Sequence, residues 1–192
     1  MTQILAIGRY HGMDAQAMRD EFGAARIDAL EELETLPQAA RESVIGVAYK
    51  GHQAFGPGQM DLLPNLRMIA KYGVGYDAID IPAAKARGIA VTNTPDVLTD
   101  ATAEIALLLM LGAARNAASA IATLRSGQWK NWAPTGMLGM ELTGKRLGIL
   151  GLGRIGRATA QRARAFGMEV HYHNRRRLGP ADEAGAIFHD SV

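Results

Sequence analysis

Short apolar runs alternate along the chain with segments in which apolar positions recur every three or four residues. A run of consecutive apolar residues is typical of a strand buried on both faces of a parallel sheet, and the longer period predicts a helix. Strands are expected at residues 3–8, 44–49, 67–72, 89–92, 147–150, 169–173 and 186–189, and helices at residues 13–25, 81–87, 99–125 and 154–166. Residues 27–33 fit either state, and a polar helix or a loop begins at residue 36. This alternation predicts an α/β fold with parallel sheets.

The segment 99–125 predicts one long helix with an unusual distribution of apolar residues. Thr99 or Asp100 can cap its N-terminus, and Glu104 lies in the first turn, where the helix dipole favours a carboxylate. Residues 105–111 are apolar on every face, which predicts burial between domains or between subunits. The same run is too short to span a bilayer, so no membrane contact is expected.

Three glycines follow the predicted strand 147–150 and open the next helix. Gly151, Gly153 and Gly156 spell G-x-G-x-x-G inside a strand–turn–helix–strand unit, which is the context that a dinucleotide-binding fingerprint requires. Gly151 is expected to allow the tight turn, Gly153 to let a pyrophosphate approach the backbone, and Gly156 to let the helix pack against the sheet. The helix N-terminus, at Arg154 and Ile155, would present N–H groups to the phosphates. A plain glycine-rich turn is the alternative.

The end of the following strand carries the signal for the type of dinucleotide. An NAD-preferring domain places Asp or Glu there to bind the ribose 2′-OH. This chain has Asn174 followed by Arg175, Arg176 and Arg177. A carboxylate would repel a 2′-phosphate, whereas arginine can bind one bidentately. We therefore predict NADP as the preferred cofactor, with NAD as the alternative. The three arginines could also form a solvated basic loop that binds no cofactor.

Composition narrows the class of protein. The chain has 192 residues, 48% of them hydrophobic, which is enough for one large domain or two small ones. The net charge is +2 and the other basic residues are scattered, so no nucleic-acid partner is expected. The absence of cysteine excludes disulfides and cysteine-ligated metals, and no metal site is predicted. Residues 1–5 lack the features of a signal peptide, which favours a cytoplasmic protein.

Four ordered motifs resemble one known family. They are KYGVGYD at 71–77, VTNTP at 91–95, ATAE at 101–104 and GKRLGILGLGRIG at 144–156. They are similar to the D-isomer-specific 2-hydroxyacid dehydrogenases, especially the glyoxylate/hydroxypyruvate reductase branch. The resemblance implies a flavodoxin-like substrate domain over 1–98, a linking helix and interface loop over 99–143, and the first half of a Rossmann NAD(P)-binding domain over 144–192. It also implies a homodimer formed through the linking helix.

The resemblance assigns roles to residues of the first half of the chain. The family's loop matching Val74 and Gly75 offers backbone N–H groups to the substrate carboxylate, and Gly51 follows another strand at the same kind of position. Ligands of open α/β sheets bind outside the carboxyl ends of the strands, where these residues fall. Val74 and Thr102 would also contact the nicotinamide end of the cofactor. A plain turn is the alternative for Gly73 and Gly75.

The family's catalytic Arg, Glu and His come from positions downstream of the one matching Val192. No catalytic residue is therefore assigned, and all five histidines are given structural or solvent-exposed roles. His171 and His173 are expected to face opposite sides of their strand. Because a full dinucleotide domain has two halves, we expect the chain to be part of a longer protein or a truncated product, with an open apolar edge at residues 147–150.

Two functions follow as hypotheses. The first is an oxidoreductase that uses NADPH to reduce a small 2-keto acid, such as glyoxylate or hydroxypyruvate, to the D-2-hydroxy acid, with the chain alone predicted inactive. Formate and phosphoglycerate dehydrogenases are related alternatives within this class. The second is a non-catalytic nucleotide-sensing or interaction module. Transcriptional corepressors that resemble this family show that the fold can serve such a role.

Overall fold

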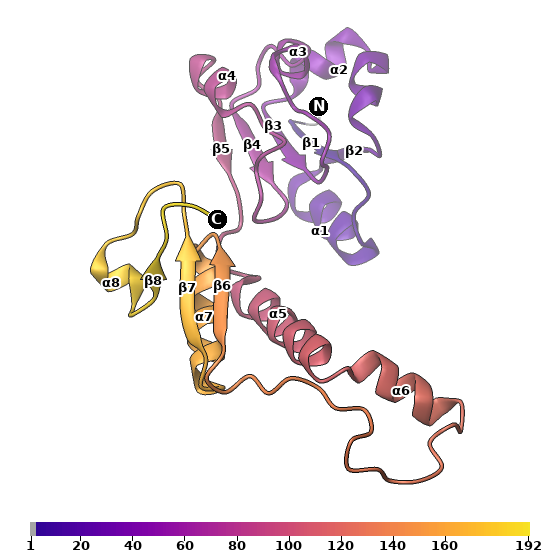
Figure 1. Ribbon diagram of the computed structural model, residues 1–192. Coiled ribbons are helices and arrows are strands. Elements are labelled where there is room, and N and C mark those ends of the chain that lie inside the picture. The colour runs from indigo at the N-terminus through magenta and orange to yellow at the C-terminus, as the bar shows by residue number, and fades with distance from the viewer. Residues whose placement is uncertain (1–2) are drawn as a thin grey trace. The chain divides into compact units, whose positions relative to one another are not determined.

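The computed structural model describes residues 3–192 (Figure 1), and the chain divides into two compact units at the boundary between Val97 and Leu98. Met1 and Thr2, which belong to the segment read as lacking a signal peptide, lie outside the described residues. Across residues 3–192 the strands form one five-stranded sheet in the first unit and one three-stranded sheet in the second. All strand pairs in these sheets are parallel, which confirms the predicted α/β class.

The first unit has the strand order of a flavodoxin-like fold. Its strands are β1 (Ile4–Ile7), β2 (Ala25–Ile27), β3 (Gly46–Tyr49), β4 (Met68–Lys71) and β5 (Ala90–Thr92), in the order β2-β1-β3-β4-β5. Its helices are α1 (Gly12–Phe22), the 3-10 helix η1 (Leu30–Thr35), α2 (Gln38–Ser43), α3 (Pro57–Asp61) and α4 (Ile81–Ala86). The order reverses between β1 and β3, and ligands of such sheets bind at this switch point, outside the carboxyl ends of the strands.

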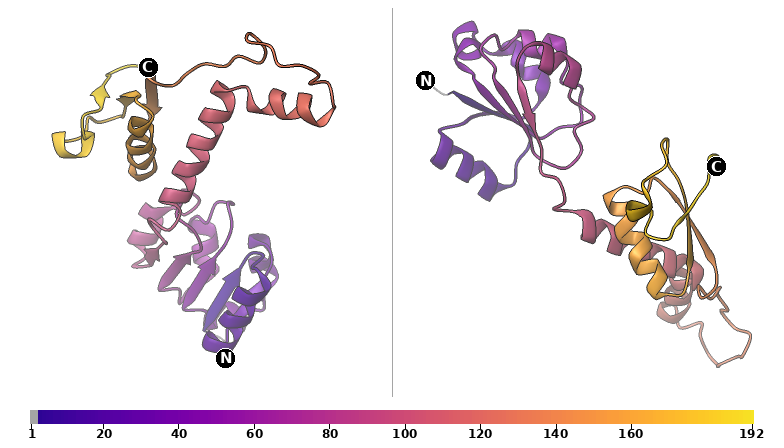
Figure 2. Two further views of the ribbon diagram at one scale, coloured as in Figure 1. Left: turned by 90° about the horizontal axis from the view of Figure 1, so that it is seen from below. Right: turned by 90° about the vertical axis from the view of Figure 1, so that its left-hand side faces the viewer.

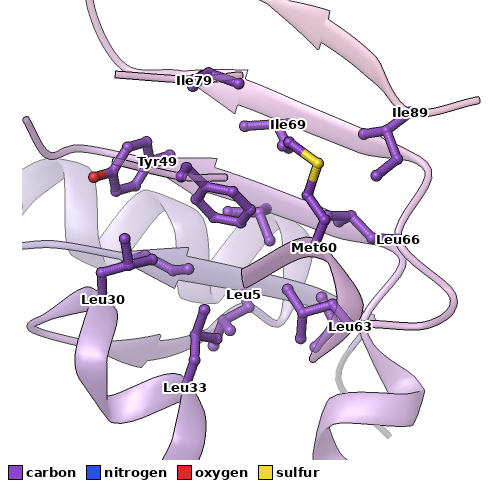
Figure 3. Close-up of a cluster of buried hydrophobic side chains, with 14 of the residues drawn as sticks. Leu5, Leu30, Leu33, Tyr49, Met60, Leu63, Leu66, Ile69, Ile79 and Ile89 are labelled. Carbon is purple, nitrogen blue, oxygen red and sulfur yellow. The ribbon is translucent and has the colours of Figure 1, made fainter. Parts of the chain in front are cut away.

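The core of the first unit lies against one face of its sheet. Leu5, Val47 and Ile69 stand opposite one another on β1, β3 and β4, and they pack with Leu33 of η1 and Met60 of α3 (Figure 3). The small side chains of the opposite face pack with α1 instead. Alternate residues of a strand point to opposite faces, so both layers follow from the sequence pattern.

The second unit contains the first strand–helix–strand unit of a Rossmann-type domain. Its strands are β6 (Arg146–Leu150), β7 (Glu169–His173) and β8 (Ile187–Phe188), and its helices are α5 (Thr99–Ala114), α6 (Ala117–Arg125), α7 (Arg154–Ala165) and α8 (Pro180–Glu183). Buried Ala160 of α7 packs with Val170 and Tyr172 of β7, so α7 covers one face of the sheet (Figure 2). β6 lies at the sheet edge and Leu150 is 70% exposed. The expected open edge is confirmed, whereas the expected burial of this strand on both faces is wrong for the described chain.

The predicted helix 99–125 is two helices, α5 and α6, which meet at an angle of 68°. The break falls at Asn116, whose φ of 53° is left-handed. The predicted cap is also wrong, because Leu98 is the N-cap and the Asp100 carboxylate instead pairs with Arg162 of α7 at 2.9 Å. Within residues 3–192 no single helix is long and apolar enough to cross a membrane, although this bent pair passes the same test of length and composition together.

The apolar surface of α5 is buried on one side. Ala103 and Leu107 are buried, while Leu108 and Leu109 are 62% and 67% exposed. Within residues 3–192, α5 packs against α7, and the predicted burial of its remaining apolar side chains between domains or between subunits stays a prediction. What covers the other face stays a proposal.

Two short helices were not predicted. α3 and α8 span fewer than two turns, so apolar periodicity cannot identify them. Both carry proline in the first turn, Pro57 and Pro180, and this was the available signal. Residues 27–33, left open by the sequence, complete β2 and enter η1, and residue 36 leads into α2.

Candidate functional site

The turn between β6 and α7 requires two of its three glycines for structural reasons. Gly151 has a φ of 96°, and its N–H donates to the carbonyl of His173 at 2.9 Å. A Cβ on Gly156 would lie 2.4 Å from the Gly151 carbonyl oxygen, so the helix could not approach the turn as closely. These two positions therefore need glycine whether or not a ligand binds.

The fold does not require glycine at position 153. Its φ of −82° is accessible to any residue, and a Cβ placed there would meet nothing within 4 Å. It is the N-cap of α7, where the first N–H groups of the helix lack intrahelical acceptors. The missing side chain leaves open space directly at the positive end of the helix dipole, which suits an anionic group.

Asn174 connects the two loops of this site. Its side-chain Oδ1 accepts a hydrogen bond of 2.7 Å from the N–H of Leu152, in the middle of the glycine turn. The oxygen is thereby committed to the protein, which leaves the amide Nδ2 as the group available to a ribose. The bond fixes the start of the arginine loop against the glycine turn.

The three consecutive arginines have different surroundings in the structure. Arg175 and Arg176 line a pocket of about 840 Å³, which also includes Leu150, Gly151, Gly153, His173, Asn174 and Val192. Arg177 does not line this pocket, because its guanidinium is bound to Glu183. The pocket falls within the size range of ligand sites. Leu150 and His173 were not among the predicted site residues, and their place at the ends of β6 and β7 was the signal for them.

In the first unit, the predicted substrate-binding residues follow neighbouring strands. Gly51 comes after β3, Val74 and Gly75 come after β4, and these two strands are paired in parallel. Asn93 Nδ2 donates to the Val74 carbonyl at 2.7 Å and so restrains the loop. A Cβ on Gly51 would lie 2.6 Å from the hydroxyl oxygen of Tyr49, so packing alone explains that glycine.

Gly75 differs from Gly51. A Cβ there would lie at an ordinary contact distance of 3.5 Å from Asp77 Oδ2, so the fold does not demand glycine. A separate pocket of about 540 Å³ in the same unit runs beside α4 and β5 and contains none of the three predicted residues. We therefore place the candidate substrate edge at the ends of β3 and β4.

Lys71 is a charged residue at this edge that sequence reasoning missed. It is 7% exposed, its ammonium donates to the Gly51 carbonyl, and its Nζ lies 4.9 Å from the centre of the Tyr49 ring. Burial lowers the pKa of this lysine, because the charged form loses its hydration. A lone lysine at the end of an apolar strand was the signal in the sequence.

Val74 lies in the first unit, and Thr102 is exposed on α5 of the second unit. The nicotinamide contact that the family resemblance implies for each residue stays a prediction. Arg154 and Ile155 occupy the first turn of α7, beside the space left by Gly153.

The histidines of β7 share one face, which corrects the expectation that they face opposite sides. Residues two positions apart in a strand point the same way. His171 Nδ1 lies 2.8 Å from Nε2 of His189, and His173 Nδ1 lies 2.8 Å from the His189 carbonyl oxygen. His11 and His52 are exposed in loops of the first unit.

Comparison with known proteins gives consistent matches. The family model described as D-isomer specific 2-hydroxyacid dehydrogenase, NAD binding domain, matches residues 107–190. A glyoxylate reductase of Thermococcus kodakarensis is 52% identical over 133 residues, which cover 67% of this chain and 40% of that protein. A glycerate dehydrogenase of Hyphomicrobium methylovorum is 41% identical over 187 residues, or 95% of this chain and 53% of that protein.

A solved structure also matches. The NADPH-dependent glyoxylate/hydroxypyruvate reductase of Sinorhizobium meliloti, in complex with NADP and malonate, is 33% identical with a TM-score of 0.80. The match covers 98% of this chain and 57% of that chain. The chain thus spans about half the length of the curated relatives that it matches.

Proposed function

We propose that this chain, a member of the D-isomer-specific 2-hydroxyacid dehydrogenase family in its glyoxylate reductase branch, binds NADP through its second unit and a small 2-keto acid through its first. The observation that carries this proposal is the pairing of the open space at Gly153 with Arg175 and Arg176 in one pocket. The first feature suits a pyrophosphate and the second suits a 2′-phosphate.

The residues present fit this cofactor. The pyrophosphate would lie over Gly153 against the first turn of α7, at Arg154 and Ile155, and the 2′-phosphate would meet the two arginines. Thr102 would contact the nicotinamide end. When bound, the reduced nicotinamide supplies a hydride for the keto carbon. The NADP complex of the Sinorhizobium meliloti relative supports this assignment.

The first unit would hold the substrate by its carboxylate. The backbone N–H groups at Gly51, Val74 and Gly75 would donate to it, and the Lys71 ammonium would add a positive charge at the same edge. Recognition through the carboxylate suits small 2-keto acids such as glyoxylate and hydroxypyruvate. The names of the relatives, glyoxylate reductase and glycerate dehydrogenase, support this substrate class.

The cofactor assignment is tested by binding of two nucleotides to the 192-residue chain. Adenosine 2′,5′-bisphosphate carries the 2′-phosphate and AMP lacks it, and calorimetry gives the dissociation constant of each. Each charge-assisted contact contributes about 1.5–3 kcal/mol before desolvation, so Arg175→Ala or Arg176→Ala should weaken the bisphosphate about tenfold. AMP binding should change little. Arg125→Ala, on α6, is the control. Equal binding of both nucleotides by the wild type would refute the proposal.

A non-catalytic nucleotide-binding module is the second candidate. It is favoured by His173, the histidine that lines the pocket, whose Nδ1 is committed to a backbone carbonyl rather than to a carboxylate. The test is to follow NADPH oxidation by the 192-residue chain with glyoxylate and with hydroxypyruvate. Both candidates predict binding without turnover for this chain, because the family's catalytic Arg, Glu and His match positions downstream of Val192, so turnover would refute the module. Turnover of about 1–1000 per second would mean that a group within this chain transfers the proton.

We further propose a homodimer formed through α5, α6 and the loop that follows. Leu108, Leu109 and Leu124 of the two helices are exposed, as are Trp129 and Trp132 of the loop. Large apolar side chains exposed in one region of a protein often mark an interaction site. The exposed tryptophans are of the type that anchors interfaces.

A further inference from the structure

Arg177, the third arginine of the run, is held by a buried carboxylate on α8. Glu183 is 8% exposed, and its Oε1 accepts a hydrogen bond of 2.7 Å from Arg177 Nε. Arg177 Nη2 lies 3.3 Å from Oε2, so both oxygens face the same guanidinium. The guanidinium carbon also lies 5.6 Å from the centre of the Phe188 ring. Arg177 therefore covers Glu183 from the solvent side.

Tyr172 completes this group from within the sheet. Its buried hydroxyl donates to Glu183 Oε1 at 2.7 Å and accepts from the N–H of Leu178 at 3.2 Å. The hydrogen bonds from Arg177 and then from Tyr172 lower the pKa of Glu183, so the carboxylate stays ionised at neutral pH. The chain just after Arg176 is thus anchored by a side chain and by a backbone amide.

The other end of the same loop is anchored by Asn174, through its bond to the glycine turn. Arg175 and Arg176 are the two residues between these anchors, and both line the pocket. A short span fixed at both ends has few alternative conformations. Its side chains then bind a ligand without first ordering the loop, which improves affinity.

We propose that Glu183 is a positioning residue for recognition of the 2′-phosphate, acting through Arg177 and Leu178 on Arg175 and Arg176. This inference rests on the proposed NADP binding. Glu183 has two effects in this arrangement. It holds the loop in the shape that presents the two arginines, and it turns the Arg177 guanidinium away from the pocket. Its own charge is paired with Arg177, so it does not repel the phosphate.

The competing explanation is that Tyr172, Arg177 and Glu183 only hold α8 against the sheet. A purely structural role would change the fraction of folded protein and would weaken every nucleotide equally. A positioning role would weaken the 2′-phosphate contact selectively. The ratio of the dissociation constants for AMP and for adenosine 2′,5′-bisphosphate separates the two roles, because it does not depend on the folded fraction.

The experiment compares Glu183→Gln with Asp182→Asn in the 192-residue chain. Asp182 is the neighbouring carboxylate on α8 and pairs with Arg157 of α7, so its variant makes the same change of charge without touching Arg177. Both nucleotides are titrated by calorimetry at one salt concentration, since charge contacts are screened by salt. Small misplacement of binding groups has large effects, and Glu183→Gln should lower the ratio on the order of tenfold. Asp182→Asn should leave it unchanged.

The possible results distinguish a failure of the positioning role of Glu183 from a failure of the proposed NADP binding. A wild type without preference for the bisphosphate refutes NADP binding itself. A wild type with the preference and a Glu183→Gln variant that keeps it refutes the positioning role. Tighter bisphosphate binding by Glu183→Gln also refutes it, because a released Arg177 would then be a phosphate ligand. If Glu183→Gln does not fold, Tyr172→Phe, which removes the Leu178 anchor, must lower the ratio or the inference fails.

Discussion

The glycine turn offers a paired test in which one substitution affects stability and its neighbour affects binding. Gly156→Ala places a Cβ 2.4 Å from the Gly151 carbonyl oxygen, where ordinary contacts begin at 3.4 Å. The obstructing atom belongs to the backbone of a turn whose N–H is bonded to His173. It cannot rotate away as a flexible side chain would, so α7 or the turn must shift.

Two opposing effects determine how much Gly156→Ala changes the free energy of unfolding. Overpacking of this kind costs about 1–3 kcal/mol, while alanine gains about 1 kcal/mol over glycine inside a helix. Because the clash is with backbone, we place the cost at the upper end and expect a net loss of about 2 kcal/mol. For a domain of this size, that lowers the melting temperature by roughly 8–16 °C.

Gly153→Ala is the matched control. Its Cβ would meet nothing within 4 Å. Alanine is a poorer N-cap than glycine but restricts the unfolded chain, and these effects offset to within about 0.5 kcal/mol. Stability should therefore hardly change, while the methyl group should weaken nucleotide binding by occupying the space proposed for the pyrophosphate.

The assay must report on the second unit, because the two units can unfold separately. Hydrogen exchange followed by mass spectrometry in peptides of β6 and β7 meets this need. Wild-type exchange in Gly156→Ala would refute the close approach of helix and turn. A loss of protection in Gly153→Ala as large as in Gly156→Ala would show that this glycine is structural, and the argument from open space would fail.

Three further predictions concern the rest of the chain. Ile69→Ala removes a side chain that is fully buried in the first unit, and should lower the free energy of unfolding by about 2–5 kcal/mol in urea titrations; a change below 1 kcal/mol would contradict the packing. Burial lowers the pKa of Lys71 in the folded state, so burying its charged form reduces the free energy of unfolding at neutral pH. This loss of stability disappears as the pH rises toward the pKa of lysine in the unfolded chain, about 10.4. The stability of the wild type relative to Lys71→Met should therefore rise between pH 7 and about pH 10, and a constant difference would refute this. Leu108→Glu on the exposed face of α5 should convert a dimer into a folded monomer in light scattering, whereas a wild-type monomer at all concentrations would refute the dimer.

Local patterns in the sequence were sufficient to predict the helices and strands of the second unit and the glycine turn of the cofactor site. The alternation of apolar runs with helical periods predicted β6, α7 and β7, and the glycine spacing predicted a turn in which Gly151 and Gly156 have the expected geometric roles. These features depend on residues within a few positions of one another. Their conformational preferences and side-chain directions are set by the local backbone.

Contacts between residues far apart in sequence were decided by the tertiary structure. Three adjacent arginines look equivalent in the sequence, yet Arg177 is bound because Glu183 and Tyr172 converge on it, while Arg175 and Arg176 line the pocket. Lys71 became a candidate for the substrate edge because β3 brings Gly51 beside it. The faces of α5 are buried or exposed according to whether α7 lies against them. Each outcome depends on which groups the fold brings within bonding distance, and spacing along the chain carries no information about that distance.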